Sequence, residues 1–339
     1  MPKIVHWGVL SASWIARTRV IPAMQQSDIM KVVAIAARDR ARAEEIAKAN
    51  NIEAVHDSYE AVLADKNVDA IYIPLPNPLH VEWSIKAMEA GKHVLCEKPI
   101  AMNAEEAARL IPVRDRTGMI VEEGFPFVNH PQWTYIQDML ASGEIGDVRS
   151  VSMTMAYNNK KPDDLRNIAA QGGGGLYDAG CYLINAARII YKQEPTRGIA
   201  LFDFDPDFGT DRLTTAILEF PGGHAALSMM TQAGPTTGGS HQHLGVVGTG
   251  GWMRANFPLS HSTASPCSVF LGTAGALGGL HTKEVPFPVV NQYQLQAERF
   301  SRLVRGEPAK AWPIENGVNN MKVIDALFRS GKSQRWEKI

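Results

Sequence analysis

Cysteine is scarce in this sequence of 339 residues. The three cysteines, Cys96, Cys181 and Cys267, form no C-x-x-C pair, so neither a disulfide framework nor a zinc site is expected. No run of about 18 apolar residues occurs, so no membrane-spanning helix is predicted. Residues 1–5 lead straight into an apolar stretch and lack the pattern of a signal peptide. A reduced, cytoplasmic location is the resulting expectation.

An excess of charge of either sign is missing as well. Lysine and arginine number 34 against 35 aspartates and glutamates, for a formal net charge of -1. No surface for nucleic acid or for an anionic membrane is therefore predicted. The length is too great for one ordinary core and suits two domains.

Residues 1–124 predict a doubly wound α/β domain. Apolar stretches typical of strands alternate there with helical patterns. Strands are expected over residues 3–9, 31–37, 69–75, 93–97 and 119–123, and helices over 15–26, 41–50, 79–90 and 103–116. Strands that are apolar throughout and alternate with helices indicate a parallel sheet covered on both faces. Pro112 is expected to kink or shorten the last of these helices.

Residues 125–339 predict an α+β domain with a large, mostly antiparallel open sheet, because few helical patterns separate its strands. Strands are expected over residues 147–157, 196–204, 212–220, 224–231 and 242–248, and closing helices over 293–304 and 315–330. Apolar and polar residues alternate along 148–155, so one face of the sheet should pack on the domain's own helices. The other face should then associate with a second copy of the chain, which predicts a homodimer. The active site is expected in the cleft between the two domains.

The turn after the first expected strand has the features of a weakened phosphate-binding loop. Dinucleotide-binding folds place G-x-G-x-x-G here, so that the backbone approaches a pyrophosphate at a helix N-terminus. The corresponding residues are Ser11, Ser13 and Ala16, which are small and keep part of that approach. Trp14 and Ile15 belong to the same turn and complete this candidate cofactor segment. A plain strand–helix turn is the alternative.

The end of the second expected strand favours NADP over NAD. NAD-binding folds usually carry an acidic residue there, which binds the ribose 2′-hydroxyl. This sequence has Ala36-Ala37-Arg38 instead. Arginine binds phosphate through two parallel hydrogen bonds, so Arg38 is the candidate for the 2′-phosphate of NADP. A solvated loop cation beside Asp39 is the alternative.

Four segments resemble the Gfo/Idh/MocA oxidoreductase family. Glu97-Lys98-Pro99 ends an expected strand, and residues 74–80 (PLPNPLH) resemble the family's T-P-N-x-x-H cofactor loop. Residues 122–125 (EEGF) with 130–132 (HPQ) resemble its E-A/G-F and H-P-Q segment. Residues 172–185 (GGGGLYDAGCYLIN) resemble its G-G-G-x-L-x-D-x-G-x-Y motif, in the form of the branch with dihydrodiol dehydrogenases, NADP-dependent xylose dehydrogenases, aldose–aldose oxidoreductases and glucose–fructose oxidoreductase.

The resemblance implies a Rossmann domain that binds NADP and a substrate that is a sugar or a cyclic diol. It adds to the candidate cofactor site a set of loop residues, namely Pro76, Asn77, His80, Glu97 and Lys98. Asn77 could instead cap the helix that follows. The sequence departs from the family at Pro74, where threonine is frequent, and at Phe127-Val128, where a Tyr-Arg pair is frequent.

Lys98, Asp178 and Tyr182 are the candidate catalytic residues. Hydride transfer to nicotinamide requires removal of the hydroxyl proton, and a free tyrosine with a pKa of about 10 is a poor base near neutrality. A nearby ammonium lowers that pKa. The resemblance implies that Tyr182 exchanges the proton, that Lys98 lowers its pKa and that Asp178 orients the substrate.

Further expectations concern the surroundings of these residues. Asp178 and Tyr182 are four apart in an expected helix, so they should share one face. The Lys98-Pro99 peptide should form a sharp turn, with a cis bond. Arg166 is expected to reach the cofactor or the substrate. A core tyrosine and a solvated lysine are the alternatives to catalytic roles.

Two other functions compete with an NADP-dependent dehydrogenase. One is an aldose–aldose transhydrogenase that never releases its cofactor, and the other is a nonenzymatic regulator that senses dinucleotide or sugar. Regulators of this fold tend to lose the lysine that is present here as Lys98, which favours an enzyme. No metal site is expected, because His241 and His243 have no third ligand spaced nearby.

Overall fold

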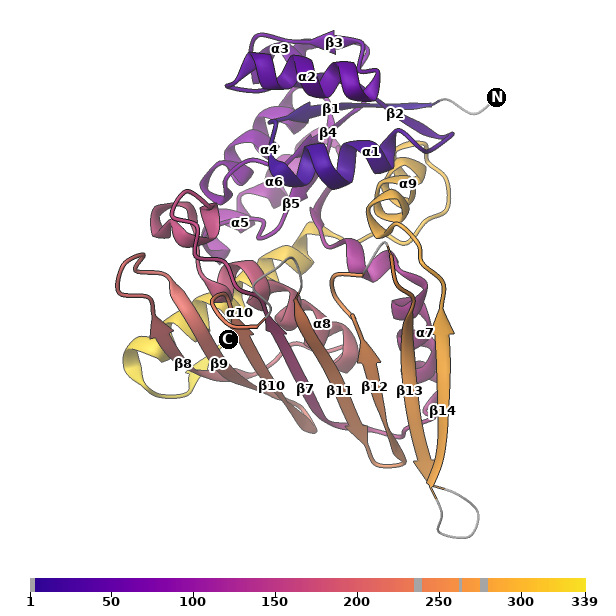
Figure 1. The fold of residues 1–339 in the computed structure, drawn as a ribbon, viewed down its shortest axis with the longest axis vertical. Helices are drawn as coiled ribbons and strands as arrows, with labels where there is room; N and C mark the ends of the chain where they lie inside the picture. Colours follow the sequence, from indigo (N-terminus) through magenta and orange to yellow (C-terminus); the bar gives the residue numbers. More distant parts are fainter. Residues whose placement is uncertain (1–3, 235–239, 262–263, 275–279) are drawn as a thin grey trace. The chain divides into compact units, whose positions relative to one another are not determined.

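The chain divides into two compact units. The computed structural model describes residues 4–234, 240–261, 264–274 and 280–339 (Figure 1). By internal contacts, one unit is Met1–Pro126 with Asn291–Val318, and the other is Phe127–Val290 with Asn319–Ile339. Residues 291–318, which the sequence places in the second domain, pack with the first unit in the structure. The domain boundary between residues 124 and 125 stays a prediction.

The first unit contains a six-stranded sheet with the order β3-β2-β1-β4-β5-β6. The strands are β1 (Val5–Leu10), β2 (Met30–Ala36), β3 (Ala54–Val55), β4 (Ala70–Ile73), β5 (His93–Glu97) and β6 (Val121–Gly124). All neighbours pair in parallel. The predicted doubly wound Rossmann sheet is therefore confirmed; only the short β3 was not expected.

Helices connect these strands. They are α1 (Ile21–Met24), α2 (Arg40–Asn50), α3 (Tyr59–Ala64), α4 (His80–Glu89), α5 (Ala104–Ala108) and α6 (Leu110–Thr117). The helix expected over residues 15–26 differs, because a π-helical turn, Ala16–Val20, precedes α1. The helix expected over 103–116 is interrupted between α5 and α6. Pro112 explains the interruption, because it cannot donate to the carbonyl of Ala108 and its ring would clash there.

The late segment of the first unit carries α9 (Gln292–Val304), which packs against α1 (Figure 1). The fully buried Trp7 of β1 lies 5.3 Å from Phe300 between ring centroids, and its indole Nε1 donates to Ser301 Oγ at 3.1 Å. Arg299 donates through Nη1 to Oε1 of Glu122 at 3.2 Å. Glu122 is only 1% exposed, so this ion pair must stay intact for the buried carboxylate to be tolerated.

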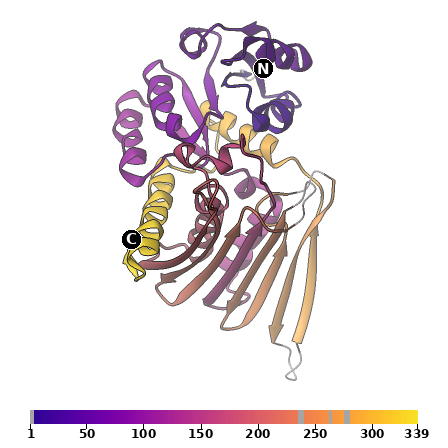
Figure 2. The same cartoon turned by 60° about the vertical axis from the view of Figure 1, so that its left-hand side comes forward.

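The second unit contains a nine-stranded sheet with the order β14-β13-β12-β11-β7-β10-β9-β8-β15 (Figure 2). The strands are β7 (Val148–Ala156), β8 (Arg197–Phe204), β9 (Asp211–Phe220), β10 (Gly223–Met230), β11 (His241–Gly248), β12 (Gly251–Asn256), β13 (Cys267–Ala274), β14 (Leu280–Phe287) and β15 (Glu337–Lys338). Of its pairings, β7 with β10 is parallel and the others are antiparallel. The expected mostly antiparallel sheet is confirmed, although β12 to β15 were missed.

Three long helices belong wholly or partly to this unit: α7 (Pro131–Ser142), α8 (Cys181–Tyr191) and α10 (Ile314–Ser333), whose first residues belong to the first unit. The helix α7 was not expected from the sequence. The helix α8 is buried on most sides and contacts β7 and β10. Residues along β9 and β10 alternate between buried and exposed positions, as a sheet covered on one face requires. None of the described helices combines the length and apolar character needed to cross a membrane.

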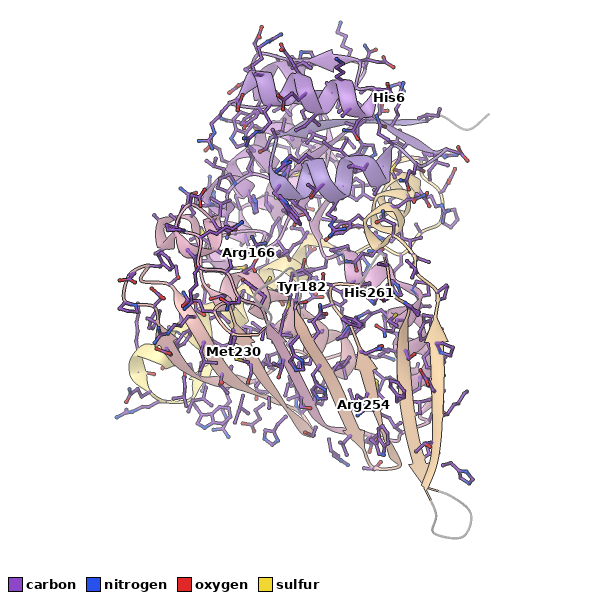
Figure 3. All side chains as sticks on the ribbon, in the orientation of Figure 1. His6, Arg166, Tyr182, Met230, Arg254 and His261 are labelled. Carbon is purple, nitrogen blue, oxygen red and sulfur yellow. The ribbon has the colours of Figure 1, made fainter. Side chains whose placement is uncertain are left out.

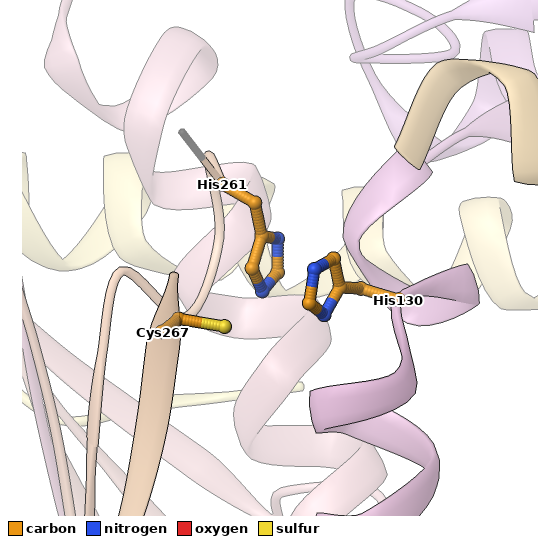
Figure 4. Close-up of side chains that lie close together, drawn as sticks. All are labelled: His130, His261 and Cys267. Atoms are coloured by element: carbon orange, nitrogen blue, oxygen red, sulfur yellow. The ribbon is translucent and has the colours of Figure 1, made fainter. Parts of the chain in front are cut away.

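A buried histidine pair, His130 and His261, lies at the start of α7 (Figure 4; Figure 3 also labels His261). The rings of His130 and His261 stack at 3.5 Å, with planes 5° apart. The backbone N–H of Gln132 donates to Nδ1 of His130 at 3.1 Å, so that ring carries its proton on Nε2. The Gln132 amide group donates to two carbonyls, of Asn256 and Ser268, which leaves Oε1 to accept from Nε2 of His261 at 3.0 Å.

Among the described residues, His130, His261 and Cys267 form the group whose atoms lie close enough to hold a metal ion, all within 4.8 Å (Figure 4). The hydrogen bond of His130 argues against that use, because its Nδ1 accepts from the N–H of Gln132 and its Nε2 therefore carries the proton and has no lone pair for a metal. Burial also raises the pKa of the Cys267 thiol to about 11, which disfavours the thiolate that metals bind. We assign the cluster to packing and helix capping.

The turn before α8 depends on glycines that leave no room for side chains. A Cβ on Gly173 would lie 2.6 Å from the carbonyl oxygen of Arg166, and one on Gly174 would overlap Oδ1 of Asp211. Gly174 also has φ of +114°, a conformation that L residues rarely adopt. The buried Asp211 in turn accepts from the backbone N–H of Leu176 at 2.8 Å. The glycine run therefore fixes where the next turn begins.

Replacing Gly174 by alanine should destabilise the protein strongly, since both the backbone conformation and the contact with Asp211 oppose a Cβ. We expect a loss on the order of 3 kcal/mol in the free energy of unfolding, measured by urea denaturation. The control is Gly143→Ala, because Gly143 has φ of +75° but no atom near its Cβ position. That variant should lose only about 1 kcal/mol. Equal losses in the two variants would show that the close contact is unimportant.

Acid should destabilise the protein through His130. Burial lowers the pKa of His130 from 6.5 to about 4, so between these values the unfolded chain binds a proton that the folded chain does not. The corresponding stability is present above pH 6.5 and is lost as the pH falls towards 4. We expect this group to account for on the order of 2 kcal/mol of that loss.

Urea denaturation at several pH values tests this expectation. His130→Asn can still accept the N–H of Gln132 but cannot titrate, so its stability should fall less steeply over the same range. His224→Gln, which removes an exposed histidine on β10, should keep the wild-type slope. If the free energy of unfolding of His130→Asn fell with pH as steeply as that of the wild type, His130 would not be the source of the acid destabilisation.

Candidate functional site

The turn after β1 has the backbone that a glycine would provide. Ser11 has φ of +134°, and its N–H donates to the carbonyl of Ala36 at 2.9 Å. Ser13 Oγ accepts from the N–H of Ala16 at 3.3 Å, at the start of the π-helical turn. Trp14 is 56% exposed, whereas Ile15 is partly buried and packs on the core of the unit. Ser11 thus adopts a backbone conformation that is typical of glycine.

Three arginines of the first unit are candidates for binding a phosphate. Arg38 follows the end of β2 and is exposed, and its charge lowers the pKa of Tyr59 against the larger, raising effect of burial. Arg42, on α2, and Arg17, on the π-helical turn, line a pocket of about 370 Å³ together with Glu45. Neither Arg42 nor Arg17 was expected from the sequence. Arg42 could have been found, because it lies four residues after Arg38 at the start of an expected helix.

His80, the first residue of α4, has a supporting position next to the loop that follows β4. The side chain is 1% exposed, with Nδ1 at 2.7 Å from the carbonyl oxygen of Pro99 and Nε2 at 2.7 Å from that of Leu75. Burial lowers the pKa of His80, and the two hydrogen bonds oppose that shift. Pro76 and Asn77, both partly exposed, stand at the 3-10 turn Asn77–Leu79 of this loop. His80 ties the loop to the Lys98-Pro99 turn and has almost no surface left for a cofactor.

The Lys98-Pro99 peptide is cis, as expected, directly after β5. Glu97 accepts a hydrogen bond at 2.6 Å from the hydroxyl of Tyr72 on β4. The N–H of Ile100 donates to the buried Glu123 of β6 at 2.9 Å. Neighbouring strands of one sheet therefore hold the turn from both sides, and Lys98 itself is partly exposed.

Tyr293, at the start of α9, lies close to this turn. Burial raises the pKa of Tyr293, the charge of Glu97 raises it further, and the charge of Lys98 lowers it. Tyr293 was not expected from the sequence. Nothing in the local sequence could have signalled it, because only folding brings the late α9 segment to the first unit.

In the second unit, two side chains donate hydrogen bonds to Asp178, and one of them is Arg166. Figure 3 labels Arg166 and the candidate catalytic residue Tyr182. The hydroxyl of Tyr157 donates to Oδ2 of Asp178 at 2.5 Å, and Nε of Arg166 donates to the same oxygen at 3.0 Å. Burial first, and then the charge of Asp178, raise the pKa of Tyr157. The charge of Asp178 likewise raises the pKa of Arg166. Tyr157 was missed in the sequence, where it only ends an expected strand.

Asp178 and Tyr182 do not share the simple helical spacing that was expected. Asp178 lies in a π-helical turn, Leu176–Gly180, and Tyr182 in the first turn of α8. The wider π turn changes the rotation between the two residues, and such turns are frequent at functional sites. The ring of Tyr182 lies 5.8 Å from that of Phe127 between centroids. Lys98 belongs to the first unit, and Asp178, Tyr182 and Arg166 belong to the second.

Comparison with known proteins agrees with this description. Residues 5–125 match the oxidoreductase family model with an NAD-binding Rossmann fold, and residues 133–254 match the GFO/IDH/MocA C-terminal domain. An uncharacterized oxidoreductase of Rhizobium meliloti is 41% identical, with 99% of each chain covered. A D-xylose 1-dehydrogenase (NADP(+)) of Haloferax volcanii is 33% identical over 96% of this chain and 97% of the relative.

A solved structure is also similar along nearly the whole chain. It is a 3-ketoreductase from Actinomadura kijaniata in complex with NADP and TDP-benzene, with a TM-score of 0.87 and 28% identity over 97% of this chain and 98% of that one. Two family models and relatives aligned from end to end lead to one conclusion: the chain belongs to the Gfo/Idh/MocA family of oxidoreductases.

Proposed function

We propose that the protein is an NADP-dependent oxidoreductase that transfers a hydride between the nicotinamide and a hydroxyl-bearing carbon of a sugar or a cyclic diol. The observation that carries the proposal is the anchored Lys98 turn at the carboxyl end of β5, where parallel sheets of this type bind their ligands. The names of two relatives support it, since one is an NADP(+)-dependent xylose dehydrogenase and the other a ketoreductase crystallised with NADP.

The residues of the first unit fit NADP. The glycine-like backbone at Ser11 allows close approach of a pyrophosphate to the turn, and Ser13 and Ile15 stand where the helical turn begins. Arg38, Arg42 and Arg17 all belong to this unit and are the candidate cations for the 2′-phosphate. Trp14, Pro76, Asn77 and Glu97 complete the proposed cofactor site, with His80 as a positioning residue. When bound, NADP accepts or supplies the hydride.

Proton transfer is assigned to the protein's own side chains. We assign the exchange of the substrate hydroxyl proton to the hydroxyl of Tyr182, with Lys98 stabilising the phenolate by its positive charge. Asp178 is held in a fixed position, because Tyr157 and Arg166 both donate to its Oδ2. It therefore orients the substrate and does not exchange the proton.

The homodimer expected from the alternating strands belongs to the same proposal. On β8 and β9, Leu201 is 70% exposed, Leu213 37% and Ile217 40%. Exposed apolar side chains on neighbouring strands are typical of surfaces that associate. The dimer stays a prediction.

The preference for NADP over NAD tests the role proposed for Arg38 and Arg42. Arg38→Ala and Arg42→Ala should each raise the KM for NADP by about tenfold or more, because each removes a charged hydrogen bond to phosphate. The KM for NAD should change little, since NAD lacks that phosphate. Initial rates with both cofactors measure this, and Arg116→Ala, an exposed arginine of α6, is the control. Equal use of NADP and NAD by the wild type, unchanged in Arg38→Ala, would contradict the assignment.

Variants of Lys98 and Tyr182 test the catalytic roles proposed for these residues. Lys98→Met and Tyr182→Phe should each lower kcat by about 10²- to 10⁴-fold, with a smaller change in KM. The two losses should not add in the double variant, because both residues act on one proton. Tyr135→Phe, which removes a hydroxyl elsewhere in the second unit, should leave kcat unchanged. NADP binding measured by calorimetry should survive in all variants, and a kcat above about a tenth of wild type in either single variant would refute the roles.

A further inference from the structure

Arg166 has donor groups that the folded chain leaves unused. Its Nε donates to Asp178 and its Nη1 to Asp164 at 3.2 Å. Within the described part of the chain, Nη2 has no hydrogen-bond partner, and the side chain is 40% exposed. A guanidinium has five N–H donors in a rigid planar fork. Its position is thus set by two carboxylates, while one edge of the fork is available to a ligand.

The loop that carries Arg166 is well fixed. The 3-10 turn Leu165–Asn167 is capped by Asp164, whose side chain accepts from the N–H of Arg166 at 3.0 Å. The buried Asn167 donates to the carbonyl of Lys161 at 2.9 Å, and the N–H of Gly174 donates to the carbonyl of Arg166 at 2.8 Å. The exposed edge of the guanidinium is therefore preorganised, so a ligand would not have to order it.

The charge around this edge is already balanced. Asp164 and Asp178 both contact the one guanidinium. An anionic ligand group would gain little from Arg166 and would meet the two carboxylates. A neutral oxygen, such as a hydroxyl or carbonyl, can accept from Nη2 without that repulsion.

We infer that Arg166 is a specificity-determining residue, which donates through its exposed edge to a second, neutral oxygen of the substrate and selects uncharged polyols over phosphorylated sugars and sugar acids. The inference rests on the proposed function only in placing the substrate beside Asp178. The two carboxylates have different roles. Asp178 orients the substrate, whereas Asp164 fixes the orientation of the Arg166 guanidinium and balances its charge. From the sequence, Arg166 is expected to reach the cofactor or the substrate, and this role is the contact with the substrate.

Three substrates of one scaffold test the inference: the best neutral aldose or diol, its deoxy analogue without the second hydroxyl, and its sugar acid. The wild type should prefer the parent over the deoxy compound by about 10- to 100-fold in kcat/KM, because a site built to bind a hydroxyl rejects the analogue that lacks it. In Arg166→Gln and in Arg166→Lys this preference should shrink to about threefold, with most of the change in KM.

The acid analogue tests the charge balance separately. Asp164→Asn removes one carboxylate and should raise the use of the acid relative to the parent by about tenfold. Arg254→Lys, an exposed arginine on β12, is the control and should keep all wild-type ratios. Circular dichroism and NADP affinity show whether each variant folds, and Arg166→Lys keeps the charge if Arg166→Gln does not fold.

The outcomes separate the inference from the proposed function. Unchanged preferences in Arg166→Lys, or no shift towards the acid in Asp164→Asn, would overturn the role of Arg166 while the oxidoreductase activity stands. If the wild type oxidises or reduces none of the compounds, the proposed function fails. In that case, calorimetry measures the affinity of the NADP-loaded wild type and variants for the same three compounds. The ratios of these affinities, parent to deoxy compound and acid to parent, then test the role of Arg166.

Discussion

The absence of space at Gly173 and Gly174 is the constraint on which the second unit's functional residues depend. The carbonyl of Arg166 and the carboxylate of Asp211 occupy the positions that side chains would take there. Because the backbone can pass between them, the π-helical turn Leu176–Gly180 begins at a defined point, and Asp178 follows within hydrogen-bond reach of Tyr157 and Arg166. A bulkier turn would shift all of these contacts together.

The first unit achieves a comparable rigidity by different means. A fully buried His80 links the loop after β4 to the turn after β5, and Glu123 on β6 holds the next residue of that turn. None of these contacts requires His80 to meet a ligand. His80 of the first unit, which resembles a ligand-binding position in the sequence, thus holds its neighbours in place.

Much of the fold was predictable because its signals are local. The apolar stretches at residues 31–37 and 93–97 correspond to β2 and β5, and the alternating pattern at 148–155 corresponds to β7. The helix α7 was missed, although Pro131 at its first position is a common helix start. The strands β12 to β14 were missed because glycine, proline and polar residues interrupt their patterns.

By itself, the sequence determined the Rossmann sheet, the mostly antiparallel second sheet and the identity of the candidate residues Lys98, Asp178 and Tyr182, since periodicity and motifs are properties of neighbouring residues. Only the tertiary structure decided what surrounds them. Tyr157 and Arg166 converge on Asp178, and Tyr293 approaches Lys98, from segments far apart in the chain. Such contacts depend on how sheets and helices pack, and no local pattern in the sequence encodes that packing.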